Sequence, residues 1–269
     1  MNQNSIKNTL KNIRIHPSKG LGQNFLVDKA TLNKIVSAAG IKPSDNILEI
    51  GPGTGILTQE LAKKAKKVIA IEKDVKMVEL LRETLKDFKN VEIVPKDILK
   101  IKDEDLFRDY KLVANLPYYI TSPVIRKFLE IKNQPKVMIL MVQKEVAQRI
   151  CAKPPRMNLL AVSVQFYGTP EIINYVPKES FWPKPKVDSA IIKIVPKKSL
   201  ESLKPELFFK IVKAGFSHPR KQILGNFKNI LKIGGENLLA WLKANSVSPD
   251  RRAESLSVGD WINLAETFD

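Results

Sequence analysis

The chain has 269 residues, 43% of them hydrophobic, so it is long enough to bury the cores of one large and one small domain. Its single cysteine, Cys151, excludes an internal disulfide bond and a zinc site built from cysteines. It has no run of about 18 apolar residues and no apolar signal-peptide core near its start, so we expect a cytoplasmic protein that does not enter a membrane.

The formal net charge is +17 at pH 7, and most of the basic excess lies before residue 199. An excess of this size favours a polyanionic partner, with RNA or DNA ahead of a membrane surface. The alternative is a lysine-rich surface that serves solubility alone, because net charge determines association and solubility and not the fold.

Seven short apolar runs predict β-strands. Helical patterns separate the early runs; Val75, Val78 and Leu81, for example, recur at spacings of three and four. Alternating strands and helices predict an α/β domain with a mostly parallel seven-stranded sheet, and the last two runs predict an antiparallel edge pair. The runs are Ile47–Ile50, Val68–Ile71, Val91–Val94, Lys111–Asn115, Val137–Val142, Val162–Tyr167 and Ala190–Val195.

Beyond a polar stretch at residues 196–199 the pattern is helical only, and Ser257 to Asp260 resembles a capping box ahead of the last helix. We therefore predict two domains: residues 1–198 with the sheet, and a small all-helical domain of residues 199–269.

A glycine-rich loop, EIGPGTG at residues 49–55, follows the first predicted strand. Glycines such as Gly51 and Gly53 let a backbone turn tightly and approach a ligand closely. The loop lacks the Lys-Ser/Thr pair of a P-loop, and Pro52 removes an N–H group that a phosphate cradle would use. This loop favours a nucleoside that carries no phosphate.

Acidic residues follow the next two predicted strands. Glu72 lies about 20 residues after Gly51, where a carboxylate can accept both ribose hydroxyls of a nucleoside. Asp97 follows the third strand, at a point suited to an adenine amino group. Each alone is more often a helix cap. The glycine loop, Glu72 and Asp97 follow three successive strands. Together they favour a binding site, because ligands of open α/β sheets bind at the carboxyl ends of the strands.

The stretch NLPYYITSPVI at residues 115–125 follows the fourth predicted strand. Ser122 can cap a helix and Pro123 is tolerated at its first position, so residues 115–121 are predicted to form the loop between strand and helix. The alternative is a simple turn, because Asn and Pro are common turn residues.

Together these segments resemble the S-adenosylmethionine-dependent ribosomal RNA adenine dimethyltransferases, and among them the enzymes of the small subunit. The resemblance covers nearly the whole chain and includes GQNFL at 22–26, NLPYYITSPV at 115–124, FWPKPKVDS at 181–189 and RAESL at 252–256. It implies a Rossmann-like class I methyltransferase fold. The implied reaction is N6,N6-dimethylation of two adjacent adenosines in the 3′-terminal hairpin of 16S rRNA, with S-adenosyl-L-methionine as methyl donor and no metal.

The resemblance also implies site residues. The exocyclic nitrogen of adenine is a poor nucleophile, and acceptors at its two N–H groups favour the tetrahedral geometry needed for attack. The side-chain oxygen of Asn115 and the carbonyl of Leu116 suit this role, and Tyr118 and Phe181 would stack on the two faces of the flipped base. We nominate no general base. The implied cofactor contacts are Asn24, Leu26, Gly51, Gly53, Glu72, Asp97 and Asn115.

Basic residues predict the RNA contacts. Arg220 and Lys221 suit phosphate, although the family's pattern has Arg where this chain has Lys213 and a further Arg where it has Pro219. A solvated helix start is the alternative. The N-terminal segment forms a basic arm that includes Lys19. We interpret Tyr119 as a packing residue.

We expect a monomer whose partners are the small ribosomal subunit and its rRNA. One alternative is a large-subunit adenine methyltransferase of the macrolide-resistance type, which resembles Asn-Ile-Pro-Tyr where this chain has Asn-Leu-Pro-Tyr. A DNA adenine methyltransferase would prefer Asn/Asp-Pro-Pro-Tyr. Another alternative is a ribosome-assembly factor without catalysis. A combined role, in which the enzyme delays the entry of immature subunits into translation, is a further hypothesis.

Overall fold

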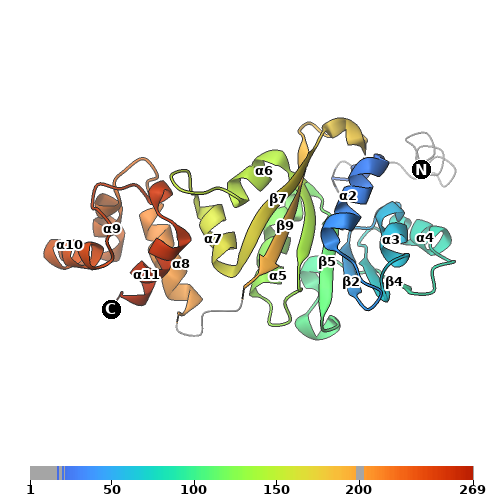
Figure 1. Cartoon of the computed structure of the whole chain (residues 1–269), viewed down its shortest axis with the longest axis horizontal. Coiled ribbons are helices and arrows are strands. Elements are labelled where there is room, and N and C mark those ends of the chain that lie inside the picture. Colours follow the sequence, from blue (N-terminus) through green and yellow to red (C-terminus); the bar gives the residue numbers. More distant parts are fainter. Residues whose placement is uncertain (1–16, 18–19, 21, 198–202, 269) are drawn as a thin grey trace. The chain divides into compact units, whose positions relative to one another are not determined.

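The computed structural model describes residues 17, 20, 22–197 and 203–268. Contacts divide the chain into two compact units (Figure 1). The sheet unit comprises Met1–Ala147 and Pro170–Pro196, and the helical unit comprises Gln148–Thr169 and Lys197–Asp269. None of the helices in the described ranges combines the length and the apolar character that a bilayer crossing requires.

A seven-stranded sheet organises the sheet unit, in the order β4-β3-β2-β5-β6-β9-β7. The pairs β2–β3, β2–β5, β3–β4 and β5–β6 are parallel, and β6–β9 is antiparallel. The predicted seven-stranded, mostly parallel sheet is thereby confirmed. The strands are β2 (Asn46–Ile50), β3 (Lys67–Ile71), β4 (Val91–Val94), β5 (Tyr110–Asn115), β6 (Met138–Gln143), β7 (Gly168–Val176) and β9 (Ser189–Pro196).

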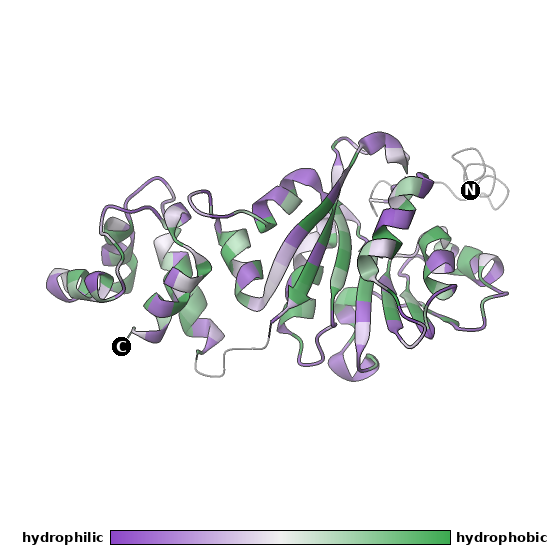
Figure 2. Ribbon diagram, viewed as in Figure 1, coloured by the Kyte–Doolittle hydropathy of each residue, from purple (hydrophilic) through white to green (hydrophobic). Residues whose placement is uncertain are grey.

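Helices cover both faces of this sheet, because alternate side chains of a strand point to opposite faces. Val113 of β5 lies in the same core cluster as Leu61 of α3 and Ile35 of α2, whereas Tyr110 of β5 packs edge-on against Phe128 of α5. The apolar faces of these helices turn toward the sheet (Figure 2). The helices that begin in this unit are α2 (Lys29–Ala39), α3 (Ile56–Ala62), α4 (Val75–Thr84), α5 (Thr121–Glu130) and α6 (Lys144–Ile150).

Short elements complete the sheet unit. A second sheet joins β1 (Phe25–Leu26) to β8 (Phe181–Trp182) in antiparallel register, so residues near the start of the chain pair with residues that precede β9. Four 3₁₀ turns lie in the connections: η1 (Ile98–Lys100), η2 (Asp103–Asp105), η3 (Tyr118–Ile120) and η4 (Lys178–Ser180).

The predicted strand over Val162–Tyr167 is wrong: these residues belong to helix α7 (Leu159–Tyr167), and the edge strand is β7, which follows directly. The sequence Val162 to Phe166 alternates between apolar and polar residues, which is the pattern of a half-buried strand, although the segment forms a helix. The helix is favoured locally because the Asn158 side chain caps it by accepting a hydrogen bond from the Ala161 N–H, at 3.0 Å.

Helix α5 begins at Thr121, without the predicted Ser122 cap. The 3₁₀ turn η3 runs directly into the helix, so the chain is already turning before Ser122 is reached. Pro123 lies in the first helical turn, where a missing N–H costs no intrahelical bond.

The helical unit adds α7 to the predicted helices of residues 199–269, because Phe166 of α7 stacks on Phe208 of α8 with ring centroids 4.0 Å apart. Trp261 is fully buried, and a Cβ on Gly215 would lie 2.3 Å from its ring, so a glycine is required there. The capping box of Ser257 and Asp260 is confirmed. The remaining elements are α8 (Pro205–Gly215), α9 (Ile223–Leu231), α10 (Gly235–Ala244), η5 (Ala253–Ser255) and α11 (Val258–Glu266).

Glu49, in β2, is a carboxylic acid that is only 1% exposed. Burial raises the pKa of its carboxyl from 4.5 to about 8; the nearby charge of Glu72 adds to the rise and the Thr58 hydroxyl opposes it. Within the described residues, Glu49 Oε2 has no hydrogen-bond partner of normal geometry. The folded chain therefore holds Glu49 in its neutral form at pH 7.

A raised pKa makes folding less favourable as pH rises from 4.5 to about 8, because the unfolded chain releases a proton that the folded chain keeps. Glu49→Gln removes this dependence, so the variant should gain stability relative to the unmodified protein between pH 5 and pH 8, by on the order of a few kcal/mol. Thermal melts at both pH values measure this gain. Glu92→Gln, at an exposed position of β4, is the control. A stability difference for Glu49→Gln that does not change with pH would contradict the assignment.

Candidate active site

The glycine loop joins β2 to α3 by a sharp turn. Gly51, Gly53 and Gly55 have φ angles of 64°, 56° and 81°, a region that favours glycine. Gly53 is also restricted by space, because a Cβ there would lie 3.1 Å from the Phe25 ring. The Gly51 N–H donates to the Ile71 carbonyl at 3.0 Å, which ties the loop to the end of β3.

Glu72 follows β3 directly and faces the glycine loop. Its carboxylate accepts hydrogen bonds from the backbone N–H groups of Asp74, at 2.9 Å, and Gly53, at 3.4 Å. Burial raises the pKa of Glu72, and these hydrogen bonds oppose the rise. The Glu72 carboxylate therefore links the backbone that follows β3 to the glycine loop that follows β2.

Asp97 follows β4, beside the same pocket. Its carboxylate caps η1 by accepting from the Leu99 N–H at 3.0 Å, and it accepts from Lys73 Nζ at 2.9 Å. The hydrogen bond from Lys73 is the main reason that the pKa of Asp97 is lowered. The helix-cap interpretation of Asp97 is confirmed, and a contact with adenine stays a prediction.

Asn115 is the last residue of β5, and its side chain reaches the N-terminal segment. Asn115 Nδ2 donates to the Asn24 carbonyl at 3.2 Å, and Asn24 Nδ2 donates to the Gly22 carbonyl at the same distance. Leu116 is buried next to it. Tyr118 is half-buried, with its hydroxyl 2.8 Å from Ser189 Oγ, and burial raises the pKa of the phenol.

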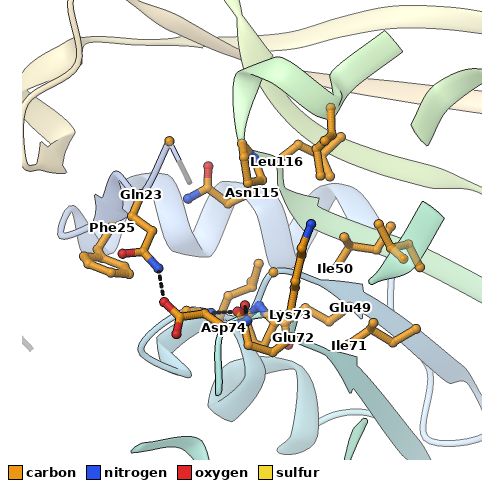
Figure 3. A pocket seen from close by; sticks show the side chains of 18 of the residues that line it. Gln23, Phe25, Glu49, Ile50, Ile71, Glu72, Lys73, Asp74, Asn115 and Leu116 are labelled. Carbon is orange, nitrogen blue, oxygen red and sulfur yellow. Dashed lines mark hydrogen bonds between the residues drawn. The ribbon is translucent and has the colours of Figure 1, made fainter. Parts of the chain in front are cut away.

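One pocket collects these features. Its lining includes Asn24, Leu26, Gly51, Gly53, Glu72, Asp97, Asn115, Leu116 and Tyr118, which come from the N-terminal segment and from the ends of four neighbouring strands. Asn115 and Glu72 lie on opposite sides of this space (Figure 3). The structure therefore brings together all the residues that the sequence analysis nominated for the cofactor.

Phe181 is not part of the pocket lining. It is 3% exposed, belongs to the main core cluster and pairs with Leu26 between β8 and β1. In this structure it anchors the N-terminal segment, and its predicted stacking on a base stays a prediction. Arg220 and Lys221 are exposed in the helical unit between α8 and α9. Lys19 lies outside the described residues.

Sequence reasoning missed three features of this site. Gln23 Nε2 donates to Asp74 Oδ2 at 2.8 Å, which links the N-terminal segment to the start of α4 (Figure 3). Glu49 lines the pocket, and Tyr119 lines it while remaining 56% exposed. Only the place of Gln23 within the GQNFL motif hinted at the first feature, because all three depend on contacts between distant parts of the chain.

Among the described residues there is no group of three or more His, Cys, Asp or Glu side chains arranged to hold a metal ion. The polar side chains that line the pocket carry carboxylates, amides, hydroxyls and lysine amines.

Curated relatives match nearly the whole chain. A protein of Dehalococcoides mccartyi named ribosomal RNA small subunit methyltransferase A is 45% identical over 263 residues, which cover 96% of this chain and 90% of the relative. A protein of Caldanaerobacter subterraneus with the same name is 44% identical over 260 residues, which cover 93% of this chain and 96% of the relative.

Solved structures agree with this relationship. A dimethyladenosine transferase from Plasmodium falciparum has a TM-score of 0.75 at 30% identity and covers 89% of this chain and 95% of its own. The 23S rRNA methyltransferase ErmE also has a TM-score of 0.75, at 28% identity, and covers 90% of this chain and 98% of its own. The fold is thus that of Rossmann-like methyltransferases.

The family model described as "Ribosomal RNA adenine dimethylase" matches residues 15–269. This match and the identity to full-length relatives show that the chain belongs to the ribosomal RNA adenine dimethylase family.

Proposed function

We propose that the chain is an S-adenosylmethionine-dependent methyltransferase that dimethylates N6 of two adjacent adenosines in the 3′-terminal hairpin of small-subunit rRNA. The observation that carries the proposal is the convergence, in one pocket, of the glycine loop, Glu72, Asp97 and Asn115. Family membership and the names of the most similar curated relatives support rRNA adenines as the substrate.

The residues of the pocket fit S-adenosylmethionine, which supplies an electrophilic methyl group when bound. The glycine loop lines the pocket without side chains at Gly51 and Gly53, so it suits a ligand that approaches the main chain closely. The Glu72 carboxylate suits two ribose hydroxyls, and Asp97 suits an adenine amino group. Acidic groups also favour a ligand that carries positive charge.

The Asn115 to Tyr118 segment suits the target adenosine. Asn115 is oriented by donating its amide to the Asn24 carbonyl, which leaves its side-chain oxygen to accept a hydrogen bond. With the carbonyl of Leu116, this oxygen would accept both N–H groups of the adenine and stabilise the charge that develops on the nitrogen. Tyr118, held by Ser189, offers a ring against which a flipped base can stack.

Contacts with RNA outside the pocket are proposed for Lys19, Arg220 and Lys221, which suit phosphate groups. The partner is the small ribosomal subunit with its rRNA, and the enzyme acts as a cytoplasmic monomer. The net charge of +17 supports an RNA partner, because a basic excess attracts the phosphate backbone.

A second candidate is methylation of large-subunit rRNA, which the TM-score of 0.75 to the 23S rRNA methyltransferase ErmE favours. The small subunit is preferred because relatives named for it reach 45% identity, against 28% for that structure. A binding factor without catalysis is disfavoured because three of the four residues nominated for transfer, Asn115, Leu116 and Tyr118, lie together in the pocket.

Methyl transfer to ribosomal subunits tests the proposal. The protein and S-adenosylmethionine are incubated with small subunits that lack the modification, with large subunits and duplex DNA as parallel substrates. Mass spectrometry of digested RNA should find two adjacent dimethyladenosines in small-subunit RNA only. Modification of large-subunit RNA alone would support the second candidate, and binding without transfer to any substrate would support the assembly factor.

Asn115→Ala should reduce the rate of methyl transfer by roughly 100- to 1,000-fold, because the adenine nitrogen loses an acceptor in the transition state. The matched control is Asn229→Ala, at an exposed position of α9. Single-turnover transfer to small subunits measures the effect. An Asn115→Ala rate within a few-fold of the control would contradict the assigned role.

Glu72→Gln should weaken S-adenosylmethionine binding by roughly 10- to 150-fold, because a charged acceptor is lost at the ribose hydroxyls. Burial raises the pKa of Glu72, so the unmodified protein should also lose affinity as pH falls, beginning above the pH at which an ordinary glutamate is protonated. Calorimetric titration of the cofactor at several pH values measures both effects, with Glu92→Gln as control. Equal affinity and equal pH dependence in Glu72→Gln and the control would overturn the assignment.

A further inference from the structure

Two adjacent tyrosines in η3 take opposite positions at the pocket. Tyr118 turns inward, with its hydroxyl 2.8 Å from Ser189 Oγ, whereas Tyr119 is 56% exposed. Both rings line the pocket, so Tyr119 lies at its rim. The exposed ring therefore stands directly beside the residues proposed to hold the target adenosine.

The ring of Tyr119 lies near the backbone of Gly22. A Cβ on Gly22 would lie 3.5 Å from Tyr119 Cδ1, 3.6 Å from Pro117 Cβ and 3.7 Å from Tyr119 Cε1. Gly22 is itself held, because its carbonyl accepts a hydrogen bond from Asn24 Nδ2. The Tyr119 ring therefore has the backbone of Gly22 on one side, while more than half of the residue stays exposed.

Cations lie around the same rim. Lys73 and Lys96 line the pocket, and the Lys73 side chain is 58% exposed. The hydrogen bond to Asp97 is the main reason that the pKa of Lys73 is raised. The nearby Tyr119 phenol contributes least to this rise. An exposed aromatic ring and lysines at the same pocket are a combination that binds single-stranded nucleic acid, by base stacking and phosphate attraction.

We propose that Tyr119 is a stacking platform for the nucleotide next to the target adenosine, with Lys73 and Lys96 attracting the phosphates nearby. This inference rests on the proposed function. When the target base leaves its stack, the neighbouring base loses a stacking partner, and an aromatic ring at the rim replaces that partner. Tyr119 is thus a positioning residue for the RNA.

The test compares Tyr119→Ala and Tyr119→Phe with Tyr175→Ala. Tyr175 is the matched control, because it is 48% exposed in β7 and lies against Lys144, outside the pocket lining. For each variant three quantities are measured: Kd for unmodified small subunits, KM for the same subunits, and Kd for S-adenosylmethionine. The cofactor Kd also reports whether the pocket is correctly folded.

Tyr119→Ala should raise both Kd and KM for subunits by roughly 5- to 150-fold, the range expected for loss of one stacked base, with an unchanged cofactor Kd. Tyr119→Phe should remain close to the unmodified protein, because stacking needs the ring and not the hydroxyl. Unchanged subunit binding in Tyr119→Ala, or a parallel loss of cofactor affinity, would overturn the inference.

The experiment distinguishes failure of the proposed function from failure of the inference about Tyr119. If the unmodified protein binds subunits without methylating them, the proposed function is wrong. The Kd values of Tyr119→Ala and Tyr175→Ala still test the role of Tyr119 in that case. If the unmodified protein is active but Tyr119→Ala has the same Kd and KM for subunits as Tyr175→Ala, the inference is wrong and the proposed function stands.

Discussion

The parallel pairing of β2, β3, β4 and β5 is the constraint on which the pocket depends. In a parallel sheet the carboxyl ends of neighbouring strands meet at one edge, so residues far apart in the sequence arrive there together. Ile50 is paired with both Ile71 and Ala114. The residues that follow these three in the sequence, which are the glycine loop, Glu72 and Asn115, therefore lie at the same edge of the sheet. The glycines then allow the chain to turn into α3 without filling the space with side chains.

A second constraint closes the pocket from the N-terminal side. The β1–β8 pair, the bond from Asn115 to Asn24 and the bond from Gln23 to Asp74 hold residues 22–26 against the strand ends. Phe181 contributes to this by packing in the core beside Leu26. The Asn115 side chain contacts the N-terminal segment and belongs to the proposed base site, so we expect cofactor binding and target positioning to be coupled.

The sequence predicted most of the fold, because short apolar strands alternate with amphipathic helices in this chain. It failed at the edge of the sheet, where the buried helix α7 has the apolar character of a strand, while the true strand β7 carries polar residues such as Glu171 and Asn174. The motifs predicted which residues gather in the pocket. The burial of Glu49 and the exposure of Tyr119 were not predictable, because both depend on tertiary neighbours that no local pattern identifies.

A crystal structure with S-adenosylhomocysteine bound tests the central claim, that the ends of four strands and the N-terminal segment form one cofactor site. We expect the nucleoside to lie between Glu72 and Asp97, with its ribose hydroxyls on the Glu72 carboxylate and its amino-acid portion beside Gly51. S-adenosylhomocysteine bound elsewhere, or bound in the pocket without contact to Glu72, would show that the site is assigned wrongly.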